Sequence, residues 1–351
     1  MIDATAEAPA ESGPDYPWTE APEPGRTLEV GEGVRWARMP LPAVLDHINV
    51  WLLEDGPEWT LVDTGVETPP TVEAWDRVCA ETMAGRPATR VICTHMHPDH
   101  IGMAGALCRR FGAALWMTRL EYVTARMLLA DTGRPAPEAG VDFYRRAGWD
   151  EAGLERYRRN FGRFGLGVSA LPDSYRRLED GAAVEIGGRT WRVIVGSGHS
   201  PEHACLYQPE LDVLIAGDQV LPRISSNVSV FPTEPDADPL ADWIASLAKL
   251  KREVPDTTLV LPSHGLPFRG LHGRLEALER GHRVSLERLE RTLAEPRRAV
   301  DVFGALFARA IEGGLLGMAT GEAIAHLNHL ERQGRAVRAT GEDGVWHWRA
   351  A

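Results

Sequence analysis

The sequence predicts an α/β (α+β) protein in which two packed β-sheets are flanked by helices. Two observations lead to this prediction. Short apolar segments bounded by turn residues, as is typical of strands, occur in both halves of the chain. Between them lie segments whose apolar residues recur at helical spacing. A sheet with one apolar face has to bury that face, so two groups of strands with helices between them indicate two sheets packed together and covered by helices.

The first group of strands lies between residues 34 and 117. The predicted strands are Val34–Trp36, Ile48–Leu53, Trp59–Val62, Arg90–Cys93 and Ala114–Met117. A turn at Asp55-Gly56-Pro57 separates the second strand from the third. A helix is predicted over Pro70–Met83, because proline is favoured in the first turn of a helix. A second helix is predicted from Asp99 to Phe111, where apolar residues recur at helical spacing.

The second group of strands follows residues 119–172, which are rich in arginine and aromatic residues and show no strand pattern. We interpret this stretch as a helical insertion beside the sheet. It is either a lid over the functional site or an element for packing or for dimerisation. The strands predicted after it are Ala183–Ile186, Thr190–Val195, Ala204–Tyr207, Val213–Ala216 and Thr258–Leu261, and the helix is Pro239–Lys251.

The two ends of the chain differ in character from the middle. Residues 1–27 are rich in Pro, Ala and Glu, with no basic start and no apolar stretch, which predicts a disordered acidic tail and not a signal peptide. Residues 28–268 form the predicted catalytic domain, and residues 269–351 a small helical domain that ends in a hairpin. Its predicted helices are Gly270–Glu295, Ala299–Ile311 and Thr320–Gln333, and its strands are Arg335–Thr340 and Val345–Trp348.

The composition excludes several classes of protein. With 44% hydrophobic and 25% charged residues, the chain resembles a globular protein, and its apolar runs are too short to span a membrane. A formal net charge of −12 argues against nucleic acid as a substrate, because binding a polyanion needs clustered cations. The cysteines suggest no disulfide framework and no CxxC site, which predicts reduced thiols and a cytoplasmic protein. They are Cys79, Cys93, Cys108 and Cys205.

Four side chains that can bind a metal lie within six residues, directly after the apolar run that ends at Cys93. Along an extended backbone His95 and His97 point to the same side. Asp99 and His100 then open the helix, so we expect the first pair to face one metal and the second pair another. Imidazole and carboxylate ligands suit zinc, manganese or iron. The alternative is a polar loop with scattered histidines.

Three later residues that can bind a metal each follow an apolar strand. His199 comes after Val193–Val195, Asp218 after the strand that starts at Val213, and His264 after Leu259–Leu261. A single His or Asp at the end of a strand is more often a cap or a turn residue. Because four stretches of the chain share this pattern, we expect their side chains to converge on one site.

With these motifs the chain resembles the metallo-β-lactamase superfamily, especially its glyoxalase II-like hydrolases, from about residue 34 to residue 268. The resemblance rests on the turn Asp63-Thr64-Gly65, the loop His95–His100, His199, Asp218 and His264, in the family's order. It implies an αββα sandwich and two metal sites. It implies that His95, His97 and His199 hold one ion, that Asp99, His100 and His264 hold the second, and that Asp218 bridges them.

On this basis we expect a hydrolase with two divalent ions, zinc in the first place and manganese or iron as alternatives. A metal-bound hydroxide would attack a small ester, thioester or lactone, with Asp99 orienting it and shuttling its proton. Asp218 argues against a true β-lactamase, since that branch of the family generally lacks the bridging carboxylate. The alternatives are a phosphodiesterase or nuclease with the same two ions, and a regulator whose metal domain has lost its activity.

The segment Thr320–Trp348 resembles a winged helix, a fold that often binds DNA. Its acidic residues would repel phosphate, so packing on the catalytic domain or dimerisation is favoured over nucleic-acid binding. These residues are Glu322, Glu331, Glu342 and Asp343. The remaining histidines of the C-terminal domain are interpreted as surface or packing residues; they are His272, His282, His326, His329 and His347.

Four further residues near the predicted ligands have two interpretations each. His203 either orients a ligand or is a buried structural residue. His47 either lines the cleft or only begins a strand. Arg223 and Asn227 either touch the substrate or belong to an ordinary loop.

Overall fold

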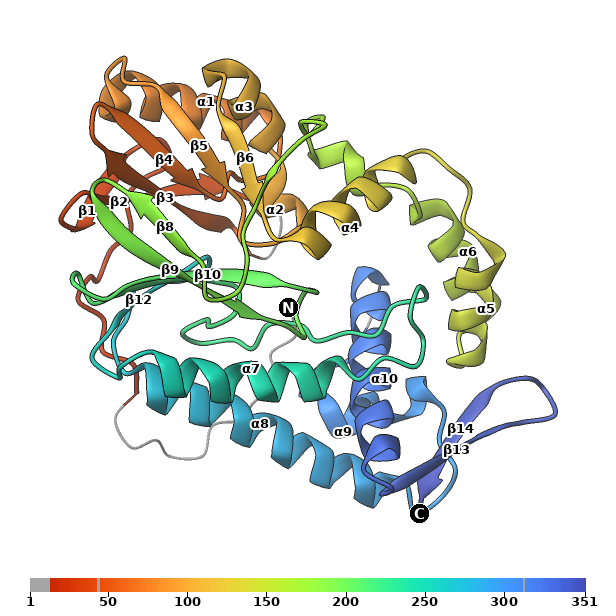
Figure 1. Cartoon of the computed structure of the whole chain (residues 1–351). Helices are drawn as coiled ribbons and strands as arrows, with labels where there is room; N and C mark the ends of the chain where they lie inside the picture. The colour runs from red at the N-terminus through yellow and green to blue at the C-terminus, as the bar shows by residue number, and fades with distance from the viewer. Residues whose placement is uncertain (1–12, 43–44, 312) are drawn as a thin grey trace.

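The computed structural model describes residues 13–42, 45–311 and 313–351. Two β-sheets pack face to face, and helices cover their outer faces (Figure 1). The predicted fold class is therefore confirmed. Within the described residues no helix combines the length and the apolar character that crossing a bilayer requires.

The first sheet has seven strands in the order β1-β2-β3-β4-β5-β6-β7. They are β1 Thr27–Gly31, β2 Val34–Pro40, β3 His47–Asp55, β4 Glu58–Val62, β5 Ala88–Ile92, β6 Ala114–Met117 and β7 Arg176–Arg177. Strand β5 is parallel to β4, with Val62 paired to Ile92. Parallel strands end at the same edge of a sheet, so Asp63 and the histidine-rich loop after β5 become neighbours.

Helices on the outer face of this sheet connect its strands. They are α1 Pro69–Arg77, its π-helical continuation η1 Val78–Met83, α2 Pro98–Ile101 and α3 Ala104–Phe111. Strand β3, in the interior of the sheet, buries every residue from Ile48 to Leu53, because the second sheet covers one of its faces and helices cover the other. This explains why, apart from Asn49, its buried residues form an apolar run and do not alternate with polar ones.

The second sheet has five strands in the order β12-β11-β10-β9-β8. They are β8 Ala183–Ile186, β9 Arg189–Gly196, β10 His203–Gln208, β11 Val213–Gly217 and β12 Leu259–Pro262. Strands β9 and β10 are antiparallel, so the segment with His199 is the turn between them. Helix α7 Pro239–Glu253 lies between the parallel strands β11 and β12, which brings Asp218 and His264 to the same edge.

Large apolar side chains from both sheets fill the space between them. Trp36 and Trp51 stack with ring centroids 6.2 Å apart, and Trp191, Val193 and Ile215 face them from the second sheet in the same buried cluster. Burying one such side chain contributes about 1.5–3 kcal/mol to the free energy of unfolding. This shared core holds the two sheets in register, and with them the strand ends that carry the predicted ligands.

The insertion and the C-terminal residues pack against each other (Figure 1). The insertion contains α4 Arg119–Ala130, α5 Glu138–Arg146, α6 Glu151–Asn160 and η2 Phe164–Gly167. The C-terminal elements are α8 Leu271–Thr292, η3 Ala299–Val302, α9 Phe303–Leu306, η4 Gly313–Leu315, α10 Leu316–Arg332, β13 Ala336–Thr340 and β14 Trp346–Ala350. Phe143 meets Trp346 edge to face at 5.8 Å, and Trp149 Nε1 donates to Thr320 Oγ1 at 2.8 Å. These contacts give the second half of the insertion a packing role.

Two sequence predictions are wrong. The predicted helix Ala299–Ile311 is only a 3₁₀ turn and one α-helical turn, because it contains two valines and Gly304, which are poor helix formers, and it ends where Phe307 is buried. The predicted disordered tail is ordered from residue 13. Asp15 pairs with Arg269 through two backbone hydrogen bonds, and Trp18 packs on the core between the sheets. The rest of that tail lies outside the described residues.

Candidate metal centre

Three imidazole nitrogens from two loops converge at one point. His95 Nε2 lies 2.8 Å from His97 Nδ1 and 3.3 Å from His199 Nε2. Burial and the neighbouring imidazoles lower the pKa of His95 well below its usual value and that of His97 to about 3. These two rings are therefore neutral at physiological pH, and their lone pairs are available to a cation.

A second set lies beside the first and combines a carboxylate with two imidazoles. His264 Nε2 is 3.4 Å from Asp99 Oδ2, and His100 Nε2 is 3.7 Å from the same oxygen. Carboxylates surround His100. Although burial lowers its pKa, Asp63, Asp99 and Asp218 raise the value to about 10. The surroundings of His100 therefore favour a positive charge at this position.

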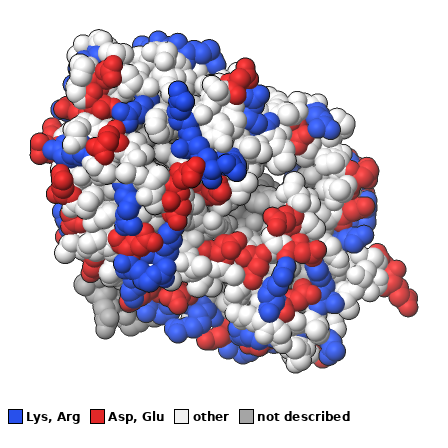
Figure 2. Space-filling view, viewed as in Figure 1, with Lys and Arg blue, Asp and Glu red and all other residues white. Residues whose placement is uncertain are grey.

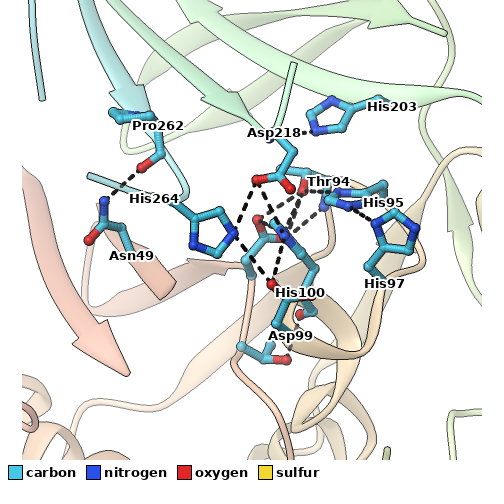
Figure 3. A network of polar contacts seen from close by, with 12 residues as sticks. Asn49, Thr94, His95, His97, Asp99, His100, His203, Asp218, Pro262 and His264 are labelled. Carbon is cyan, nitrogen blue, oxygen red and sulfur yellow. Dashed lines mark hydrogen bonds and ion pairs between the residues drawn. The ribbon is translucent and has the colours of Figure 1, made fainter. Parts of the chain in front are cut away.

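Asp218 lies between the two sets and faces both (Figure 3). Its Oδ2 is 3.3 Å from His199 Nε2 in the first set. Its Oδ1 is 3.4 Å from His264 Nε2 and 3.6 Å from His100 Nε2 in the second. Burial raises the pKa of Asp218, but His264 and His100 together bring it well below the usual value, so the carboxylate is ionised.

The chemistry of these atoms fits divalent ions. His100 Nε2, His264 Nε2 and Asp218 Oδ1 are buried and have no hydrogen-bond partner. Leaving one buried polar atom without a hydrogen bond costs about 1–3 kcal/mol, and a bound cation would satisfy all three atoms at once. A set of imidazole nitrogens and carboxylate oxygens is the donor set of zinc, and also of manganese and iron.

Asp63 orients His100 from the end of β4. His100 Nδ1 donates to Asp63 Oδ2 at 2.8 Å, and the backbone N–H and the hydroxyl of Thr94 donate to the same carboxylate, each at 2.8 Å. Because Nδ1 carries the proton, the lone pair of Nε2 faces the centre. Asp63 has a left-handed backbone, with φ of 60°. The turn that the sequence marked as a motif therefore holds the predicted ligand His100 in place.

Backbone carbonyls orient the two later histidines of the predicted ligand set. His199 Nδ1 donates to the carbonyl oxygen of Asn227 at 2.8 Å, and His264 Nδ1 donates to that of His47 at 2.8 Å. The His47 ring also accepts from the N–H of Gly265 at 2.9 Å, so His47 holds the loop that carries His264. In both ligands Nε2 is left as the free acceptor.

His203 is fully buried, and its ring contacts the backbone of the predicted ligand Asp218. Its Nε2 accepts from the backbone N–H of Asp218 at 3.0 Å. Gly217 approaches this ring so closely that a Cβ there would lie 2.4 Å from it, and its φ is 54°. A glycine is therefore required before Asp218.

Glu121 is a residue of this site that the sequence did not reveal. It lies in the first turn of α4 and is fully buried. Its Oε2 accepts from the N–H of Met96 at 2.9 Å, and its Oε1 accepts from the N–H of Glu202 at 2.7 Å. It thus ties the loop of His95 to the loop of His199. An acidic residue in the first turn of a helix is common, so no local pattern distinguished it.

Other residues named from the sequence make contacts with residues outside the predicted ligand set. The guanidinium of Arg223 lies 5.7 Å from the ring centroid of Tyr16. His282 and His326 are buried against each other, and His329 is bonded to Asp238, in agreement with a packing role.

Comparison with known proteins agrees with this geometry. A model of the metallo-beta-lactamase superfamily matches residues 43–264, and a model of the metallo-beta-lactamase-like C-terminal domain matches residues 286–351. The crystal structure of a beta-lactamase domain protein from Burkholderia ambifaria is 42% identical, with a TM-score of 0.89, covering 96% of this chain and 98% of that one. A metallo-beta-lactamase family protein from Thermus thermophilus is 27% identical, with a TM-score of 0.77, covering 92% of this chain and 100% of that one.

A relative of described activity is more distant. An acyl-coenzyme A thioesterase from Bos taurus is 25% identical over 213 residues, which span 54% of this chain and 64% of that protein.

Proposed function

The chain belongs to the metallo-β-lactamase superfamily and is a metal-dependent hydrolase, and we propose that it uses two divalent ions, zinc in the first place, to cleave a small thioester, ester or lactone. One observation carries the proposal of two ions. The two oxygens of Asp218 face two different sets of ligands, at 3.3 Å and 3.4 Å from the nearest nitrogen of each set. A carboxylate in this position fits a bridge between two cations.

The ligand set determines what the centre offers to a substrate. When bound, two divalent ions would supply a nucleophile at neutral pH from water and would polarise a carbonyl. With the ions bound, the imidazoles would act as neutral donors, and of the predicted ligands only the carboxylates of Asp99 and Asp218 would offset the four positive charges. A net positive centre favours an oxyanion that develops on the substrate.

Asp99 is the group that we assign to proton transfer. Its side chain is 24% exposed, whereas that of Asp218 is 5% exposed. Burial raises the pKa of Asp99, but His100 and His264 bring it below its usual value, so it is ionised. An ionised carboxylate that water can reach is suited to accept a proton and to release it to solvent.

A thioester is the substrate that we favour. The relative from Bos taurus is described as an acyl-coenzyme A thioesterase. The centre also needs no nucleophilic cysteine, and Cys93, Cys108 and Cys205 are buried with their pKa values raised by burial.

The free cysteines fit a reducing compartment, so we also propose a cytoplasmic location, which cell fractionation would test.

The features that a nuclease would need are weak in this chain. Helix α10 would be the recognition helix of a winged-helix domain, yet it buries every residue from Ala319 to Leu330. A helix that enters the major groove has to expose one face. On the face seen in Figure 2, acidic side chains lie between the basic ones among the described residues.

A substrate panel with metal analysis tests the proposal. The purified chain should contain two divalent ions and should hydrolyse acyl thioesters or lactones, and a chelator should abolish this activity until metal is restored. Bis-p-nitrophenyl phosphate should be a poor substrate. Asp173→Asn, at an exposed surface pair, should leave both metal content and turnover unchanged. A chain without stoichiometric metal, or one that turns over only the phosphodiester, would overturn the proposal.

A further inference from the structure

The C-terminal residues reach the candidate metal centre through a chain of hydrogen bonds. His199 Nδ1 donates to the carbonyl oxygen of Asn227 at 2.8 Å. The side-chain amide of Asn227 donates in turn to Glu322 Oε2 on α10, at 2.7 Å. Two hydrogen bonds therefore separate a side chain of the C-terminal helix from a predicted metal ligand.

Asn227 is held on both sides of its amide. Its Nδ2 is bound by Glu322, and its Oδ1 accepts from the hydroxyl of Ser229 at 2.6 Å. The backbone around it is held as well, because the N–H of Val230 donates to the carbonyl oxygen of Gly321 at 3.0 Å. With side chain and backbone both fixed, the carbonyl of Asn227 has one orientation toward His199.

Glu322 is a carboxylic acid in a buried part of α10. It is 4% exposed and lies within a stretch of α10 in which every residue is buried. Burying a carboxyl group costs free energy unless it finds a partner, and an apolar residue would serve packing at lower cost. The carboxylate of Glu322 accepts a hydrogen bond from Asn227, so its contact points toward the candidate metal centre.

Helix α10 also lies unusually close to the segment that contains Asn227. A Cβ at Gly321 would lie 2.8 Å from Ser229 Cβ and 2.9 Å from the carbonyl oxygen of Val230. Real Cβ atoms do not approach other atoms so closely, so position 321 accepts only glycine without movement of the backbone. The register between α10 and this segment is thereby fixed at the residue beside Glu322.

We propose that Glu322 is a positioning residue of the metal centre: by holding Asn227, it fixes the carbonyl that orients the imidazole of His199. The inference rests on the proposed function, since it requires a metal at the set of His95, His97 and His199. Partners that orient a metal-binding histidine are worth about tenfold to a hundredfold in metal affinity. The C-terminal unit is then a part of the metal centre.

Three variants of the full-length chain test this inference. Glu322→Leu removes the acceptor of Asn227 and should weaken one of the two metal sites by about tenfold. Glu322→Gln keeps an acceptor oxygen and should restore most of the affinity. Asn328→Ala is the matched control, because Asn328 joins α10 to the carbonyls of Pro235 and Ala237 without touching Asn227, and it should leave both affinities unchanged.

The readout is Co²⁺ titration in competition with a chelator, followed by the ligand-field spectrum of the bound ion, with circular dichroism to confirm folding. Folded Glu322→Leu with two sites of wild-type affinity and spectrum would overturn the inference, as would equal weakening in Asn328→Ala. If Glu322→Leu does not fold, Asn227→Ala decides, because it keeps the backbone carbonyl and should show the same weakening. A wild-type chain that binds no Co²⁺ would instead overturn the proposed function, and this inference with it.

Discussion

The two sets of predicted metal ligands are supported by different parts of the molecule. His100 and His264 are oriented by Asp63 and His47, which lie at the ends of strands in the first sheet. His199 is oriented by Asn227, in a loop that rests on the C-terminal helix α10. The set of Asp99, His100 and His264 is thus held by the sandwich, whereas the set of His95, His97 and His199 also depends on residues outside it.

This difference shows that a ligand and its support can come from different structural units. The sandwich brings all seven predicted ligands to one edge, but it does not by itself orient every imidazole. Orientation matters because a metal ion binds only the lone pair that faces it. Of the predictions below, those on Asp218, Asp63 and Glu121 test whether the two sets respond independently to changes in their own supports.

Replacing Asp218 should have the largest effect, because this residue faces both sets. We expect Asp218→Ala to lose more than about a hundredfold in turnover, since even partners of ligands are worth up to about a hundredfold in metal affinity. Metal analysis and turnover of the best substrate in the panel would measure this. If the variant kept two ions and wild-type turnover, Asp218 would not be a shared ligand.

Replacing Asp63 should affect mainly the set that contains His100. Asp63→Ala leaves His100 Nδ1 and the Thr94 N–H and hydroxyl without their acceptor, at a cost of about 1–3 kcal/mol for each buried group. We expect about tenfold to a hundredfold weaker metal binding at this set and a lower melting temperature. Co²⁺ spectra should show the change at the site that Glu322→Leu leaves intact. If both variants altered the same site, the proposed division between the sets would be wrong.

Replacing Glu121 should have a smaller effect, mainly on the set of His95, His97 and His199. Its carboxylate accepts from the N–H groups of Met96 and Glu202, and therefore joins the two ligand loops. Glu121→Gln keeps one acceptor oxygen and leaves one buried N–H unpaired, which costs about 1–3 kcal/mol in the free energy of unfolding. Urea unfolding and Co²⁺ titration measure the two effects, with Glu179→Gln, at an exposed ion pair, as the control. A loss confined to the set of Asp99, His100 and His264 would contradict this role for Glu121.

The smallest effect concerns the packing of α10 and appears as a pH dependence of stability. Burial, followed by the neighbouring His326 and His329, lowers the pKa of His282 to about 3. In the unfolded chain a histidine has a pKa of about 6.5, so between these values only the unfolded state binds this proton. The free energy of unfolding should therefore fall as the pH decreases from about 6.5.

In His282→Leu the unfolded state no longer binds this proton. Between pH 6 and 4 the free energy of unfolding should fall less steeply in the variant than in the wild type. The two slopes should differ by about 1.4 kcal/mol per pH unit. Urea unfolding of both chains in the presence of a chelator measures the difference. Without metal, the histidines of the predicted ligand set contribute equally to the pH dependence of the two chains. Parallel pH profiles for the two chains would show that His282 stays solvated and that this interface is loose.

Much of the metal centre can be predicted from local sequence. His95 and His97 are two residues apart after a strand, and the alternation of side chains along an extended chain directs both to one side. Asp218 and His264 follow apolar strands, and the ends of parallel strands meet at one edge of a sheet. The seven predicted ligands could therefore be placed together before the structure was known, because each depends on the short-range geometry of its own segment.

The supports of the ligands were decided by tertiary structure. Glu121, Asn227 and Glu322 act through single hydrogen bonds to segments distant in the chain, and such contacts leave no periodic pattern in the sequence. The order of residues 13–27 likewise depends on Arg269 and on the core between the sheets, although their composition is typical of a disordered tail. A strand end determines which side chains reach the centre, whereas their orientation depends on hydrogen bonds that form only after distant elements have packed.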